Sequence, residues 1–295
     1  MKRPFSLHLF RLAAGTAPAL LLVCVGTLIG YLAWRGAPTL RLSLFFGSTP
    51  VWDGLTGARP VWDGIWPACA GTLCLVGLTL LLAVFPGVGC GIYLAEYASP
   101  AWKRRIGGAV NMLAGMPSIV MGLFGFSLIL LLRHSVAPRA NTGMLLAASC
   151  LALLVLPVLV ATTREALEAV PDSLRLAASA LGMTPARRLS HVLLPISVRG
   201  IGGGVVLALG RAAEDTAVIM FTGVVANAGL PAGLTDKFES LSFSIYYTAA
   251  QYQDQAELLR GFGTALVLLG ISVMLLCAAR FLENGYRRRW RGGDA

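Results

Sequence analysis

Residues 164–195 read REALEAVPDSLRLAASALGMTPARRLSHVLLP, a polar stretch between two strongly apolar regions. This stretch holds much of the charge in the second half of the chain. Charged side chains are costly in the hydrocarbon core of a bilayer. We therefore expect the stretch to lie at a membrane surface, and what it meets there bears directly on function.

The composition is that of an integral membrane protein. Of the 295 residues, 56% are hydrophobic and 13% are charged, and the mean hydropathy is +0.73. Soluble domains carry roughly 25% charged residues. The sequence therefore predicts an all-α protein with one polytopic domain.

The net charge of +10 does not indicate a nucleic-acid-binding protein, because the basic residues gather at the ends of apolar runs. The cysteines fall mostly inside apolar runs, as small packed residues do, and no C-x-x-C or H-E-x-x-H pattern occurs. The sequence therefore predicts no metal site.

Six apolar spans reach the length of about 20 residues that a bilayer requires. They are 12–34, one span within 64–95, 106–132, 140–163, 196–225 and 261–279. Most basic residues lie on the side shared by both chain ends and the stretch 164–195, which predicts that this side is cytoplasmic. We divide the chain into an N-terminal helix with an extracytoplasmic loop (1–63), a core (64–285) and a basic cytoplasmic tail (286–295).

Pro117 lies inside the third span and would interrupt its backbone hydrogen bonds. Small residues on both sides of it, among them Gly122 and Gly125, would permit close helix contact. A packed, kinked helix and a gate both fit this pattern.

The stretch 164–195 reads as two short amphipathic helices. Asp172 suits a helix start and Gly182 a helix stop. Thr184 can cap a second helix with Pro185 at its first position. The flanking spans argue against a DNA-binding helix-turn-helix, whereas a simple connector and a lever that inserts into a cytoplasmic partner both remain open.

The same stretch resembles the EAA loop of binding-protein-dependent ABC importers. That pattern is E-A-A, three residues, glycine, nine residues and I-x-L-P; Ala177, Ala178, Gly182 and residues 192–195 match it in register. Leu176 occupies the position of the family glutamate. The resemblance implies contact with an ATPase through Ala177, Ala178, Gly182, Met183, Thr184, Arg187 and Pro195.

Three further stretches narrow the resemblance. GIYLAEYA (91–98), NMLAGMPSIVMGLFGF (111–126) and GRAAEDTAVIMFTG (210–223) are similar to the phosphate-uptake permeases, nearer the PstA type than the PstC type. This implies a type I (MetI-like) permease fold with six transmembrane helices and a cytoplasmic coupling helix pair, in a bacterial inner membrane. The implied function is import of inorganic phosphate, with sulfate, molybdate or tungstate as the alternative substrates.

The resemblance also implies an assembly. Its members would be a second permease (PstC type), an ATPase homodimer (PstB type) that binds ATP and magnesium, and an extracytoplasmic phosphate-binding protein (PstS type). The chain itself would bind no cofactor and no nucleic acid, only membrane lipid. No Walker A sequence occurs, since no lysine follows a glycine.

Charged residues inside the fifth span are the candidates for the translocation pathway. Arg211 is three residues before Glu214 and four before Asp215, so both acids can lie beside it on a helix. A buried ion pair and an arginine that meets an oxyanion both fit this spacing. The candidate pathway residues are Arg211, Glu214, Asp215 and Thr216. A membrane enzyme that uses Glu214 and Asp215 is a weaker alternative, because adjacent residues on a helix diverge by about 100°.

Overall fold

The computed structural model describes residues 5–135, 138 and 140–291. This part of the chain is helical, apart from loops and one isolated bridge between Val224 and Phe238. Six of its helical segments are long and apolar enough to cross a membrane. The predicted all-α membrane fold is confirmed; the end of the predicted basic tail, residues 292–295, lies outside the described residues.

The helices follow one another from α1 to α13. The long ones are α1 (Phe5–Gly36), α4 (Trp66–Ile92), α5 (Pro100–Ala114), α6 (Ser118–Ser135), α7 (Met144–Glu168), α10 (Leu194–Glu214) and α13 (Gln255–Arg291). The short ones are α2 (Leu42–Phe46), α3 (Val51–Thr56), α8 (Asp172–Ala180), α9 (Pro185–Arg188), α11 (Ala217–Thr222) and α12 (Leu241–Gln251). Two π-helical turns, η2 (Tyr93–Tyr97) and η3 (Leu189–Leu193), follow α4 and precede α10.

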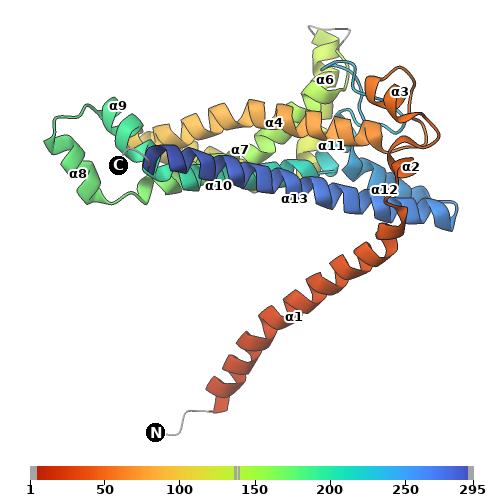
Figure 1. Ribbon diagram of the computed structural model, residues 1–295. Coiled ribbons are helices and arrows are strands. Elements are labelled where there is room, and N and C mark those ends of the chain that lie inside the picture. Colours follow the sequence, from red (N-terminus) through yellow and green to blue (C-terminus); the bar gives the residue numbers. More distant parts are fainter. Residues whose placement is uncertain (1–4, 136–137, 139, 292–295) are drawn as a thin grey trace.

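Helices α4, α7, α10 and α13 form an elongated bundle (Figure 1). Helices α8 and α9 lie at one end of it, which we call the coupling end, and α2, α3 and α12 lie at the other, which we call the far end. Helix α1 meets α13 near the far end and then diverges from the bundle, and α6 rises steeply away from the bundle axis. The apolar window of α1 has no buried residue, so α1 is held by its last turns.

Helix α7 lies at the centre of the bundle and packs against α4 and α10. Glycines on both of these helices let them approach α7 closely. A Cβ on Gly87 of α4 would lie 2.7 Å from the Leu159 Cβ, and one on Gly91 would lie 2.6 Å from the Thr163 Cβ. On the α10 side, Gly200 and Gly204 face α7 in the same way. Both pairs have the small-x-x-x-small spacing that packs membrane helices without side chains between them.

The third span is shorter than predicted. Residues 106–132 do not form one kinked helix: α5 ends at Ala114 and α6 begins at Ser118. Pro117 has no N–H to donate to the preceding turn, so the helix stops and restarts. The expected close contacts at Gly122 and Gly125 are present, since a Cβ there would clash with α11 or with Cys150 of α7.

The fifth span also differs from its prediction. Helix α10 ends at Glu214 rather than near residue 225, because Asp215 is extended, with ψ 118°. The Asp215 carboxylate accepts the N–H of Val218 at 2.8 Å and so begins the separate helix α11. The residues between α11 and α13, most of which lie between two predicted spans, contain α12. Its start is fixed by the Ser240 hydroxyl, which accepts the N–H of Phe243.

Candidate functional site

The loop at the coupling end is built from local capping interactions. Helix α8 ends in a Schellman motif: the N–H of Met183 donates to the Ala178 carbonyl at 3.2 Å, and that of Gly182 donates to the Ser179 carbonyl at 3.0 Å. This motif needs a left-handed residue at its centre, and Gly182 supplies it with φ +72°. The predicted glycine turn between two helices is confirmed.

The second helix of the loop begins as its sequence predicts. Thr184 is the N-cap, its hydroxyl accepts the N–H of Arg187 at 3.4 Å, and Pro185 occupies the first turn. The helix is short, because the backbone passes at Leu189 into the π turn η3 and then into α10, which contains Pro195. The loop is therefore continuous with the transmembrane helix that carries Arg211.

The loop leaves apolar side chains uncovered. Leu176 is 70% exposed and Leu181 is 77% exposed, and Leu174 is exposed as well. Ala178 is the only buried residue of α8, and α9 has none. An apolar surface outside the bundle, next to charged residues, is typical of a protein contact.

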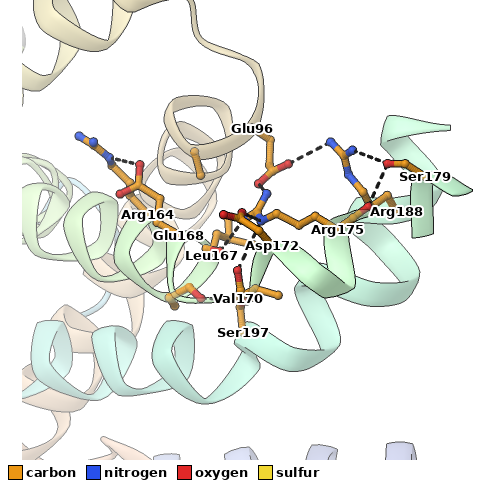
Figure 2. A network of polar contacts seen from close by, with 12 residues as sticks. Glu96, Arg164, Leu167, Glu168, Val170, Asp172, Arg175, Ser179, Arg188 and Ser197 are labelled. Carbon is orange, nitrogen blue, oxygen red and sulfur yellow. Dashed lines mark hydrogen bonds and ion pairs between the residues drawn. The ribbon is translucent and has the colours of Figure 1, made fainter. Parts of the chain in front are cut away.

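Charged side chains anchor the loop to the end of α4. The Glu96 side chain, on η2, is 5% exposed and contacts arginines of both short helices. Its Oε1 lies 2.5 Å from Nη1 of Arg175 on α8, and its Oε2 lies 3.5 Å from Nη2 of Arg188 on α9 (Figure 2). Sequence reasoning missed Glu96; the signal was an acidic residue at the end of an apolar span.

The predicted pathway residues occupy the junction between α10 and α11. Arg211 and Glu214 are exposed in this chain, and Asp215 and Thr216 are partly buried. Among the described residues, no ion pair within 4.0 Å joins Arg211 to Glu214 or Asp215. The ion pair that the spacing allowed is not formed: Asp215 lies beyond the end of α10, and Glu214, although on α10, is exposed. Arg211 lies in the last turn of α10, where a cation complements the helix dipole.

The coupling residues and the pathway residues do not form one site. Pro195 and Arg211 lie near the two ends of α10, roughly 25 Å apart at 1.5 Å per residue, and the other coupling residues precede α10. Helix α10 therefore joins a loop with an exposed apolar surface to an exposed arginine near the other end of a candidate membrane span. This arrangement defines a membrane-embedded subunit of a transport system.

The comparisons with known proteins identify the family. Residues 87–288 match the model of the binding-protein-dependent transport system inner membrane component, and the chain belongs to this family. The chain is 32% identical to the phosphate transport system permease protein PstA of Yersinia pestis, over 82% of this chain and 77% of the relative. It is 34% identical to PstA 1 of Mycobacterium tuberculosis strain H37Rv, over 77% of this chain and 72% of the relative.

A solved structure has the same fold. A chain of the inward-facing MetNI methionine ABC transporter superposes with a TM-score of 0.59 and 18% identity, covering 81% of this chain and 99% of that one. The predicted MetI-like permease fold is confirmed. The chain is thus a multi-pass transport component, and the ATPase and the second permease of such an importer are its partners.

Proposed function

We propose that this chain is the permease subunit of an ATP-driven importer and that it forms, with a second permease, the path for inorganic phosphate. The observation that carries the proposal is the similarity to the phosphate permeases, which extends over three quarters or more of this chain at 32–34% identity. It includes PstC proteins, one of them 30% identical over 75% of this chain. The similarity to both types supports a PstA–PstC type pairing.

Arg211 supports an anion as the substrate. A charged side chain costs at least about 2.5 kcal/mol at the bilayer centre, so an exposed arginine on a membrane helix must face water or protein, not lipid. Arg211 has no ion-pair partner among the described residues and is free to meet an oxyanion. Its guanidinium offers the planar fork of donors that matches phosphate.

Helices α1 and α6 support a second permease. Both are apolar and long enough to cross a membrane, yet little of either apolar window is buried within this chain. Helix α1 is held through its last turns and α6 packs through a few residues between Met121 and Ile129, so an apolar face of each stays uncovered within this chain. We infer that the second permease covers part of α1 and α6 and closes the path beside Arg211.

The coupling end supports the remaining parts of the assembly. Its exposed leucines would seat against a PstB-type ATPase homodimer, which would bind ATP and magnesium, and a PstS-type binding protein would deliver phosphate at the far end. The coupling end would face the cytoplasm of a bacterial cell, from its inner membrane. Helix α13 ends at the coupling end in Figure 1, which is consistent with a cytoplasmic C-terminus; we place the N-terminus there as well.

The test is ATP hydrolysis by the complete complex in proteoliposomes. We expect the phosphate-loaded binding protein to stimulate hydrolysis and uptake, and sulfate, molybdate and tungstate to leave both at the basal rate. Stimulation by one of the other oxyanions alone would reassign the substrate. Arg211→Ala should abolish uptake without reducing assembly, and normal uptake by that variant would remove Arg211 from the pathway.

A further inference from the structure

The two helices of the coupling loop have too little apolar burial to fix their own orientation. Helix α8 buries one small side chain, Ala178, and α9 buries none. Between them the chain turns at Gly182, around which a Cβ would find no atom within 4 Å. Helix α9 continues through η3 into α10, which sets its direction, but capping interactions do not set the angle of α8 to the bundle. Something else must hold it.

Glu96 is the group that reaches both helices. Arg175 and Arg188 lie 79 and 92 residues away in sequence, and each contacts a different oxygen of this one carboxylate. Figure 2 shows the two guanidinium groups converging on Glu96 from α8 and α9. A carboxylate that is almost fully buried needs such partners, because burying an unpaired charge is costly.

Each arginine also has a second anchor. Arg175 donates from Nη2 to the Leu167 carbonyl, at the end of α7, at 2.6 Å. Arg188 donates from Nη1 to the Ser179 hydroxyl of α8 at 3.3 Å. The network therefore closes on itself: η2 is joined to α8 and α9, α8 to α7, and α9 to α8. The contact to α9 is the longer of the two on Glu96.

Beneath these charges lies an apolar cluster that contains residues of both π turns. Leu193 of η3 is buried with Leu167 and Val170, and Ala95 of η2 packs against them. A π turn has weaker, irregular backbone hydrogen bonding than an α-helix and is often found at functional sites. The two irregular turns that connect the loop to α4 and α10 thus pack against the same apolar cluster, next to the Glu96 network.

We propose that Glu96 is a positioning residue for energy coupling: it holds α8 and α9 as one rigid unit on the end of α4. This inference rests on the proposed function. With Glu96 in place, a displacement of the short helices by the ATPase moves α4 and α10 together. Without its charge, the second anchors still hold α8 to α7 and α9 to α8, so the helices stay folded. The pair then loses its link to the end of α4, and ATP hydrolysis no longer drives that part of the bundle.

The experiment compares Glu96→Gln with wild type in the complete complex, measuring phosphate uptake and ATP hydrolysis in the same proteoliposomes. We expect phosphate moved per ATP hydrolysed to fall about ten-fold or more, because one partner of a buried charge pair is lost. Basal hydrolysis should stay within about two-fold of wild type, since the ATPase is unchanged. Glu96→Asp keeps the charge and should restore most of the coupling.

The matched control is Glu168→Gln at the same end of the molecule. Glu168 pairs with Arg164 at 2.8 Å, but both side chains are more than one third exposed, and exposed pairs contribute little. We expect wild-type coupling in this variant. Wild-type coupling in Glu96→Gln, or equal losses in Glu96→Gln and Glu96→Asp, would overturn the proposal.

Two further measurements keep the proposal testable. If Glu96→Gln complexes do not assemble, Arg188→Gln takes their place, because it leaves the Arg175 contact intact. This variant should lower the phosphate moved per ATP hydrolysed by a smaller factor. An unchanged ratio would overturn the proposal. Hydrogen exchange of residues 172–188 needs no substrate. It should be faster in the Glu96 variant than in wild type, and equal exchange would overturn the rigid unit. Failure of wild-type phosphate uptake would instead reject the proposed function.

Discussion

Replacing Gly182 separates the effect of backbone conformation from that of side-chain size. Its φ of +72° is left-handed, which costs an L-residue roughly 1–2 kcal/mol. A Cβ at this position would meet no atom within 4 Å in this chain. The whole penalty of a substitution within the permease is therefore the backbone term. Valine, which is branched at Cβ, should pay it in full, whereas asparagine enters this region more readily.

A penalty of 1–2 kcal/mol lowers the ratio of formed to unformed Schellman turn by a factor of roughly 5–30. We therefore expect Gly182→Val to lower phosphate transported per ATP hydrolysed by a factor in this range, and Gly182→Asn to lower it far less. The assay is uptake and ATP hydrolysis in the same proteoliposomes. Gly229 provides the control, because it also has a left-handed φ, +78°, and open space around it, but lies in the segment between α11 and α12.

Equal losses in the valine and asparagine variants of Gly182 would refute the backbone reasoning and indicate that any side chain obstructs the partner surface. Wild-type coupling in Gly182→Val would show that the turn does not transmit force at all. A loss of coupling in Gly229→Val as large as that in Gly182→Val would show that the effect is general destabilisation. The structure is supported if Gly182→Val loses coupling while Gly182→Asn and Gly229→Val largely keep it.

Two more predictions concern stability in detergent, followed by thermal loss of monodispersity. Gly91→Ala should lower the midpoint temperature of this loss, because its Cβ would lie 2.6 Å from Thr163 and such overpacking costs about 1–3 kcal/mol. Gly89→Ala, which has open space around it, should leave the midpoint temperature unchanged. Equal midpoint temperatures in the two variants would contradict the α4–α7 packing. Burial raises the pKa of Glu239, so the folded state loses stability as the pH rises above 4.5 through the raised value. Glu239→Gln should therefore raise the midpoint at neutral pH and leave it unchanged below pH 4.5, and a lowered midpoint at neutral pH would contradict this.

Local signals explain why the coupling loop could be predicted almost to the residue. Asp172, Gly182, Thr184 and Pro185 each act on the backbone within a few residues, and each takes the predicted role in the structure. The spans were found for a similar reason, because apolar length alone defines a membrane helix. Their ends were less accurate where a single residue changes the backbone, as at Pro117.

The pairing of Arg211 with Asp215, one of the two interpretations that their spacing allowed, shows where local reasoning fails. The i,i+4 rule assumes a continuous helix, but the carboxylate of Asp215 caps the next helix instead, and a sequence alone does not show which hydrogen bond an aspartate will choose. Glu96 was missed for a different reason. Its partners are 79 and 92 residues away, and no spacing rule joins residues so distant in sequence.

The leucine in place of the family glutamate now has a structural interpretation. Leu176 is directed outward from α8, while its neighbour Arg175 is directed inward to Glu96. The substitution therefore changes the outward surface of α8, where we propose that the ATPase docks, and leaves the internal charge network complete. An exposed leucine gains most from an apolar partner surface, and an unpaired basic residue opposite it would be desolvated at a cost. We infer that the ATPase of this importer meets α8 with an apolar pocket. The ATPase would then act at Leu176, about 100° around the same short helix from Arg175, the residue that Glu96 holds.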